Sequence, residues 1–178
     1  MPLNLFVGLK VELCQIHIGN FIKFISNTNK MELKSSVFEN NGKIPSKYTC
    51  DGDNINPQLS ISGVPKNAKS LVLIMDDPDA IKPAGKVWDH WIVFNIPPET
   101  KEIPESQEPQ GVQGITSFGR LGYGGPCPPD AEHKYIFKLY ALNTELDLNK
   151  GVTKKEVEAA MQEHIIEKTE LIGMYERN

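Results

Sequence analysis

Residues 88–96 read W-D-H-W-I-V-F-N-I, a run rich in aromatic and β-branched side chains. Such residues favour an extended backbone, so the run predicts a β-strand. Residues 70–75 and 135–142 have the same character. Turn-forming clusters lie between these runs, among them D-P-D at 77–79 and P-P at 97–98. The middle of the chain is therefore predicted to consist of strands joined by turns.

Glycine and proline support the same interpretation along the whole chain. The 178 residues include 14 glycines and 13 prolines, and eleven of the prolines lie between Pro57 and Pro129. This content excludes a helical bundle, because proline breaks helix interiors and glycine weakens them. The length fits one domain, which we assign to residues 31–178. Residues 1–30 read as an N-terminal extension, with Met31 as an alternative start.

Charge and cysteine content indicate the compartment and the classes of partner. With 19 Lys and Arg against 23 Asp and Glu, the chain lacks the basic surface that nucleic acid requires. Charged residues interrupt the apolar pieces of residues 1–30, so neither a transmembrane segment nor a secretory signal is expected. The three cysteines, Cys14, Cys50 and Cys127, are widely spaced and lack the density of a disulfide scaffold. We therefore expect a cytoplasmic protein.

Helical periodicity is found only near the C-terminus. Thr153 and Glu156 have the spacing of a capping box, and apolar residues follow at helical intervals. We expect this helix to run to about Lys168. Residues 169–176 then alternate in character and predict a last strand.

Strand alternation gives His90 an apolar setting. Successive side chains of a strand point to opposite faces, which puts Trp88, His90, Ile92 and Phe94 on one face. Taken alone, a histidine in such a row is more often a hydrogen-bonded core residue than a ligand-binding one.

Two other strands carry polar groups at their ends. His133 and Tyr135 begin one apolar face, and Asp77 ends another. We expect these three residues and His90 to converge as a shallow pocket at one end of a sheet. Such a site suits a small anion, because a charged histidine donates two N–H groups and tyrosine donates one O–H group. A nearby carboxylate would orient the imidazole and favour its charge.

The loop before His133 contributes backbone groups to this pocket. Residues 122–129 read G-Y-G-G-P-C-P-P. Glycine allows the backbone to approach a ligand closely, whereas proline has no N–H to donate. Gly124 and Gly125 are therefore the expected amide donors.

Several ordered motifs resemble those of the phosphatidylethanolamine-binding proteins, in particular the bacterial and archaeal branch called Raf kinase inhibitor-like proteins. They are D-D-P-D-A at 76–80, W-D-H-W at 88–91, G-P-C-P-P at 125–129, H-K-Y at 133–135 and I-P-x-K-Y-T-C-D-G at 44–52. The resemblance covers the chain from about Met31 onwards. It implies a mainly β fold, with a central antiparallel sheet, a second packed sheet and a short C-terminal helix.

The resemblance also implies a pocket that binds phosphate-like head groups and other small anions. Its residues in this chain would be Asp77, Trp88, His90, Gly125, Pro126, Cys127, His133 and Tyr135. We therefore expect a non-enzymatic, regulatory protein that binds a phosphate- or phosphoethanolamine-like anion, with no catalytic residues, metal or cofactor. The bacterial and archaeal branch further implies a homodimer.

This sequence departs from the family pattern at some positions around the expected pocket. Ile81 replaces the usual proline, and Lys134 replaces the usual arginine. The loop before His133 lacks the usual glycine and carries Asp130 and Glu132 instead. Both acidic residues place negative charge near the proposed anion site.

Other functions stay open at this point. Other branches of the family imply an inhibitor that acts on a protease or kinase through its surface. Cys127 with His133 could form a cysteine hydrolase, and two histidines with two aspartates could bind a metal, although no local ligand spacing supports it. Residues 51–56, D-G-D-N-I-N, look acidic enough for calcium, but the glycine is misplaced and a turn is expected.

Overall fold

The computed structural model describes residues 30–177, and the expected extension lies outside them apart from Lys30. Its centre is a six-stranded sheet with the strand order β2-β9-β8-β4-β5-β7. The four long strands are antiparallel neighbours: β9 (Ile165–Tyr175), β8 (His133–Leu142), β4 (Ser70–Asp77) and β5 (Trp88–Ile96). The short edge strands are β2 (Gly42–Lys43), parallel to β9, and β7 (Val112–Gln113).

A second sheet packs on one face of the central sheet. It contains β1 (Glu32–Ser35), β3 (Leu59–Ser62) and β6 (Glu102–Ile103), with β3 in the middle. Apolar side chains of both sheets form one core cluster, in which Leu33 and Leu59 join Leu73 and Phe137. The sheets bury these side chains from water, which is the main stabilising contribution in such a fold. The expected two-sheet, mainly β architecture is confirmed.

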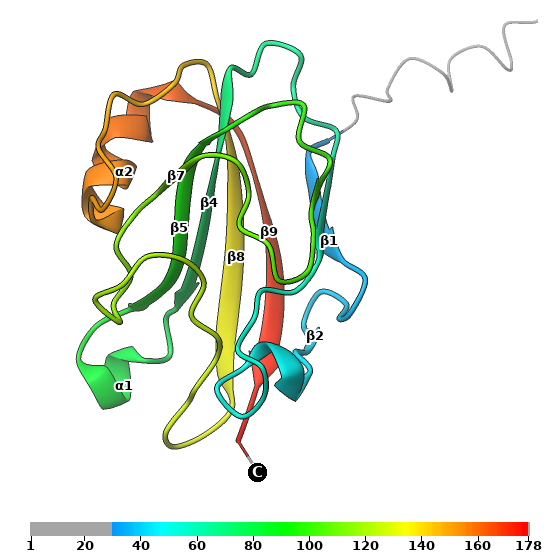
Figure 1. The fold of residues 1–178 in the computed structure, drawn as a ribbon, viewed down its shortest axis with the longest axis vertical. Helices are drawn as coiled ribbons and strands as arrows, with labels where there is room; N and C mark the ends of the chain where they lie inside the picture. The colour runs from blue at the N-terminus through cyan, green and yellow to red at the C-terminus, as the bar shows by residue number, and fades with distance from the viewer. Residues whose placement is uncertain (1–29, 178) are drawn as a thin grey trace, which may run out of the picture.

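The other face of the central sheet is covered by α2 (Lys154–Met161), which lies opposite β1 in Figure 1. The expected capping box is present at its start, where the Thr153 hydroxyl accepts from the Glu156 amide and the Glu156 carboxylate accepts from the Thr153 amide. Val157 and Met161 pack on the side chains of Val72, Ile74, Ile92 and Phe94. The apolar stripe of this helix therefore covers the sheet.

The helix ends earlier than its sequence pattern predicts. A 3₁₀ turn, η3 (Gln162–His164), follows α2, and β9 begins at Ile165. The expected helix to Lys168 is wrong, because residues 165–168 pair with the end of β8. Pairing with β8 satisfies the backbone N–H and C=O groups of these residues with hydrogen bonds. The helical spacing of apolar residues carries no information about such pairing.

Strand β5 departs from simple alternation at His90. Opposite β4, Trp91 pairs with Met75 and Asp89 pairs with Asp76, so His90 is an extra residue in a β-bulge. The bulge turns His90 to the same side as Trp91, where its ring contacts Tyr135. The expected shared face of His90 with Ile92 and Phe94 is therefore wrong, because these two side chains face α2.

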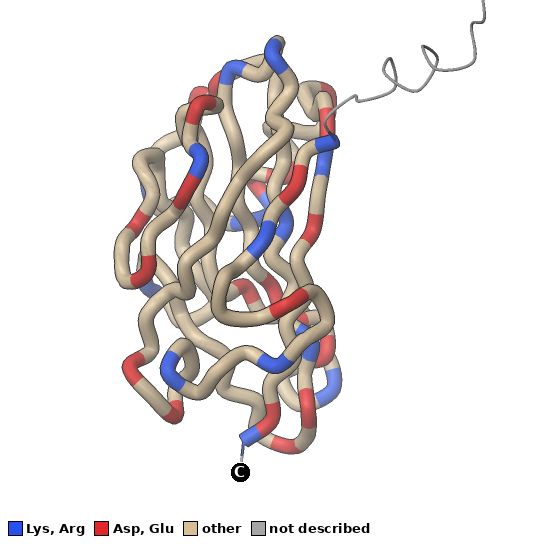
Figure 2. The backbone as a smooth tube through the Cα atoms, turned by 90° about the vertical axis from the view of Figure 1, so that its right-hand side faces the viewer, with Lys and Arg blue, Asp and Glu red and all other residues tan. Residues whose placement is uncertain are grey.

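Two short helices complete the fold, α1 (Ile81–Ala84) and η2 (Ser46–Tyr48). Residues 51–53 form the expected turn. Acidic and basic residues are interspersed along the backbone, as Figure 2 shows. Within residues 30–177, no helix is long and apolar enough to cross a membrane.

Candidate functional site

A cavity of about 320 Å³ opens at the end of the molecule where α1 and the C-terminus lie in Figure 1. Asp77 at the end of β4, Trp88 and His90 in β5 and His133 at the start of β8 all line it, together with Ala80, Pro83, Ala84, Phe118, Cys127 and Pro129. Of the four residues expected to converge, Asp77, His90 and His133 line this cavity, whereas Tyr135 does not. A larger hollow of about 530 Å³ between β1 and β9 contains none of the predicted site residues.

Asp77 has two structural roles. Its Oδ1 atom accepts hydrogen bonds from the backbone amides of Asp79 (2.9 Å) and Ala80 (3.1 Å), which fixes the turn after β4. Its Oδ2 atom accepts from His133 Nδ1 at 2.7 Å. The Asp79 carboxylate in turn accepts from the Lys134 amide and ties the turn to β8. The buried Asp77 carboxylate is therefore held in place by the backbone and orients His133.

His133 lies between two carboxylates. Nδ1 faces Asp77, and Nε2 lies 3.0 Å from Asp130 Oδ1. Burial disfavours the charged imidazole, but the hydrogen bonds and charges of Asp77 and Asp130 outweigh it and raise the pKa of His133. Both N–H groups of the imidazolium are thus already used, whereas the sequence led us to expect a free donor.

His90 is a neutral acceptor and not the expected donor. Its Nδ1 atom lies 2.6 Å from the Gly124 carbonyl oxygen, which can only accept, so Nδ1 carries the proton. Burial lowers the pKa of His90, opposed by this carbonyl and by nearby aspartates, chiefly Asp77. In the neutral ring Nε2 has a lone pair, so it accepts a hydrogen bond from a ligand.

Tyr135 is fully buried beside both histidines, with ring centroids 5.2 Å from His90 and 6.5 Å from His133. Burial, reinforced by the negative charge of Asp77, raises the pKa of Tyr135, so the hydroxyl keeps its proton. The Cys127 backbone amide opposes this rise. Within the described residues the hydroxyl completes no hydrogen bond, which makes it an uncommitted donor.

The glycine amides expected to bind a ligand are engaged within the protein. The Gly125 amide donates to Asn54 Oδ1 at 2.7 Å, and the Gly124 amide donates to the His90 carbonyl oxygen at 2.9 Å. Only glycine fits at 125, because a Cβ atom there would lie 2.5 Å from the Tyr48 carbonyl oxygen. The loop therefore shapes the cavity with its backbone but offers neither of these donors.

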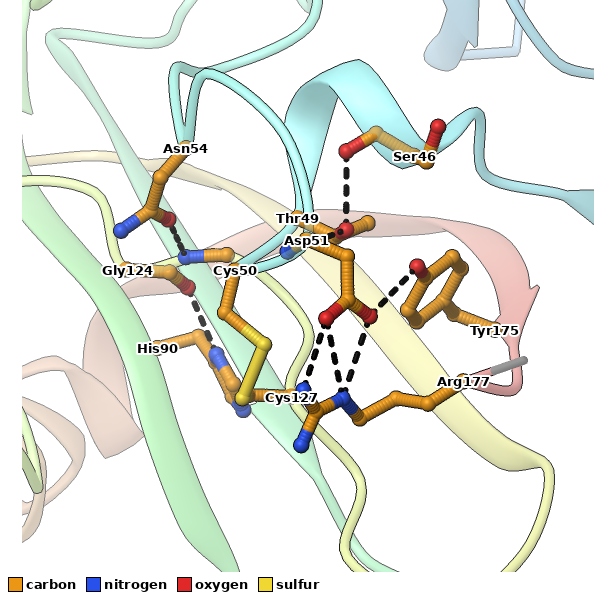
Figure 3. Close-up of a disulfide and its surroundings, with 11 residues drawn as sticks. Ser46, Thr49, Cys50, Asp51, Asn54, His90, Gly124, Cys127, Tyr175 and Arg177 are labelled. Atoms are coloured by element: carbon orange, nitrogen blue, oxygen red, sulfur yellow. Dashed lines mark hydrogen bonds and ion pairs between the residues drawn. A yellow bond between two sulfur atoms is a disulfide. The ribbon is translucent and has the colours of Figure 1, made fainter.

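A disulfide joins Cys50 to Cys127, whose Cα atoms are 5.4 Å apart although 77 residues separate them in the sequence. Figure 3 shows Asn54, Gly124 and His90 on one side of it and Asp51 with Arg177 on the other. Cysteine spacing in the sequence did not indicate this pair, because the fold brings together two residues that no local motif links. In this form Cys127 has no thiolate to act as a nucleophile.

The sequence did not indicate the roles of three residues in or around the cavity. Phe118 packs edge-on against Trp88 and His90, with ring centroids 5.5 Å and 5.3 Å away. Asp130 was noted only as a nearby charge, and Asn54 only as part of a turn. Their roles depend on how the loops pack, and loop packing leaves no periodic pattern in the sequence. Among residues 30–177, no group of three or more His, Cys, Asp or Glu side chains is arranged to bind a metal ion.

Cationic side chains surround the aromatic wall of the cavity. Lys86 Nζ lies 5.0 Å from the Trp88 ring centroid, and the Arg120 guanidinium lies 5.6 Å from that of Phe118. Lys82, in α1, reaches within 4.0 Å of Asp130 Oδ2. This arrangement attracts anions towards the opening, although the site itself contains two carboxylates.

A family model described as phosphatidylethanolamine-binding protein matches residues 34–176, most of this chain. The chain belongs to the phosphatidylethanolamine-binding protein family. This membership confirms the resemblance that the D-P-D-A, W-D-H-W and G-P-C-P-P motifs indicated.

Related proteins match this chain over most of their own length. A UPF0098 protein of Methanothermobacter thermautotrophicus is 51% identical over 153 residues, which cover 83% of this chain and 99% of the relative. One of Pyrococcus horikoshii is 54% identical over 159 residues, covering 83% and 78%.

Solved structures of the family agree with the fold. A phosphatidylethanolamine-binding protein homologue of Chlamydia trachomatis superposes with a TM-score of 0.80 at 46% identity, over 84% of this chain and 99% of the other. Escherichia coli YbcL, described as a new member of the mammalian family, gives a TM-score of 0.77 at 32% identity, with the same coverage.

Proposed function

We propose that this protein binds a small organic anion, with the anionic group at His133 and the apolar part against Trp88 and Phe118. The arrangement of His133 carries the proposal. Buried Asp77 keeps its imidazole charged from one side, and the opposite N–H points to a carboxylate that is partly exposed to solvent, Asp130. Because the Asp130 carboxylate already lies at His133 Nε2, the structure supports the view that this position accommodates a carboxylate.

The remaining polar groups suit the rest of such a ligand. His90 Nε2 accepts from a hydroxyl, an ammonium or a protonated phosphate oxygen. The buried Tyr135 hydroxyl, on a ring that contacts His90, keeps an uncommitted O–H donor next to this position. The volume of about 320 Å³ lies near the lower end of ligand pockets and admits a small molecule. Phosphate esters and short carboxylic acids fit these features.

We infer binding without turnover, because the two charged groups that line the cavity, Asp77 and His133, are held by other groups of the protein. His133 donates to two carboxylates, so it is not a free base. Asp77 accepts three hydrogen bonds and is fixed in the turn after β4. Inhibition of a protease or kinase, a regulatory role, a homodimer and a cytoplasmic location stay predictions from resemblance and composition.

Nuclear magnetic resonance of the histidine side chains tests the proposal. Addition of phosphate, phosphoethanolamine or acetate to millimolar concentration should shift the His133 and His90 signals in a saturable way. His164, which bonds to Asn143 near the start of β9, serves as an internal control and should stay unchanged. Unchanged His133 and His90 signals with all three anions would overturn anion binding at this site.

A further inference from the structure

Asp130 lies in the exposed loop that leads into β8. Its Oδ1 atom is 3.0 Å from Nε2 of His133, three residues further along the chain. Its side chain is 35% exposed, whereas that of Asp77, on the other side of the ring, is 5% exposed. The two carboxylates that hold His133 are therefore unequal in their surroundings.

We propose that Asp130 is an internal competitor for the anion site, a carboxylate of the protein that occupies the position on His133 where a ligand's anionic group binds. This inference rests on the proposed function and adds a control of its affinity and selectivity. A ligand that binds His133 must first displace Asp130.

The hydrogen-bond geometry makes the two occupants mutually exclusive. An imidazolium has two N–H groups, and Nδ1 is committed to Asp77. Asp77 cannot move aside, because its other oxygen accepts from the amides of Asp79 and Ala80 in the turn. Nε2 is therefore the one N–H of His133 that can meet a ligand, and Asp130 now covers it.

Asp130 is the partner that can leave. Its other oxygen, Oδ2, lies 4.0 Å from Lys82 Nζ, and the Lys82 side chain is 88% exposed. Such a surface pair restrains a carboxylate weakly. A loop that carries Asp130 outward leaves it in water, where its charge is solvated, and leaves the Asp77–His133 pair intact.

The consequence is discrimination among anions. A tethered carboxylate competes at an effective concentration in the millimolar range, so a simple anion at lower concentration does not displace it. A ligand whose apolar part also contacts Trp88 and Phe118 gains further affinity and does displace it. Bare inorganic ions therefore bind more weakly than organic anions that also contact the aromatic wall.

The test compares Asp130→Ala with Glu132→Ala in the full chain. Glu132 lies in the same loop and pairs with Lys43, not with His133, so its removal changes the net charge equally. Dissociation constants for acetate and inorganic phosphate are measured from the His133 signal at fixed ionic strength. Asp130→Ala should bind both ions about tenfold tighter than the wild type, as expected for loss of a tethered competitor. Glu132→Ala should stay within about twofold, because a distant exposed charge is screened.

The outcomes separate this inference from the proposed function. Equal affinity of Asp130→Ala and wild type, or an equal gain in Glu132→Ala, overturns the internal competitor while anion binding stands. Absence of binding in all three proteins overturns anion binding at this site, and the competitor with it. Asp130→Asn keeps the side-chain shape and should show a gain of the same sign, which provides a second variant if Asp130→Ala folds poorly.

Discussion

His133 determines the charge of the cavity, because it is the cation between two carboxylates. Asp77 and Asp130 raise its pKa above the value of about 6.5 found in unfolded chains. Its contribution to stability is therefore fully present below about pH 6.5 and is lost as the pH rises through the folded pKa. His90 behaves in the opposite way, because burial lowers its pKa and the folded state resists its protonation.

These opposite shifts predict opposite pH dependences for two single variants. His133→Gln should lose more free energy of unfolding, relative to the wild type, at about pH 6 than at about pH 9. His90→Gln should lose more at about pH 8 than at about pH 5, because acid already destabilises the wild type through His90. Urea denaturation across this pH range measures both. Parallel pH profiles for the two variants would contradict the assigned charge states.

The gathering of Asp77, His90 and His133 around one cavity could be predicted from the sequence, but their hydrogen bonds could not. Strand ends and motifs brought Asp77, His90 and His133 together correctly. Which nitrogen of His90 carries a proton depends on the Gly124 carbonyl, which a loop presents. Likewise, the occupation of His133 by Asp130 depends on how that loop folds back. Contacts made by loops leave no periodic pattern in the sequence.

At the scale of elements, the β5 bulge places His90 in the cavity, and a charge network on the opposite face of the sheet supports it. Asp76 of β4 and Asp89 of β5 are opposite each other in the pair that follows the bulge. Lys154 of α2 contacts both carboxylates, and Lys138 Nζ lies 2.8 Å from Asp76 Oδ2. Without Lys154, two facing carboxylates would repel each other at this point.

Lys154→Met should therefore lower the free energy of unfolding by about 2–4 kcal/mol, because it leaves a buried carboxylate partly unpaired. It should also shift the His90 signal, since relaxed pairing changes the bulge. Lys155→Met, at the exposed neighbouring position, is the matched control and should change stability by no more than about 0.5 kcal/mol. Equal effects of the two substitutions in urea denaturation would show that the network does not support the bulge.

The elements themselves followed from the sequence more closely than their details. The three long apolar runs became β4, β5 and β8 because their composition and pairing agree. The β5 bulge was not predicted, because the alternation of side chains along a strand assumes that each residue faces one residue of the neighbouring strand. The end of α2 was not predicted either, because pairing with β8 stabilises the segment 165–168 as a strand.

At the scale of the whole molecule, the Cys50–Cys127 disulfide connects the η2 region to the loop beside the cavity. Cross-links of this kind stabilise a fold mainly by restricting the unfolded chain. Disulfides also persist mostly in oxidising compartments, so the cysteines no longer support a cytoplasmic location. The location stays a prediction.

Removal of the disulfide should lower the free energy of unfolding by about 2–4 kcal/mol. Cys50→Ser and reduction by dithiothreitol should have similar effects, and Cys14→Ser, which leaves the disulfide intact, serves as the comparison. Thiol titration of the denatured, unreduced protein should find one free thiol per chain. Three free thiols would contradict the cross-link.

A crystal structure grown with phosphoethanolamine tests most directly whether His133 is the anion-binding group. We expect an oxygen of the phosphate within hydrogen-bond distance of His133 Nε2, with Asp130 withdrawn and Asp77 unmoved on Nδ1. A saturated crystal in which Asp130 still contacts His133 and the phosphate binds elsewhere would contradict the proposal.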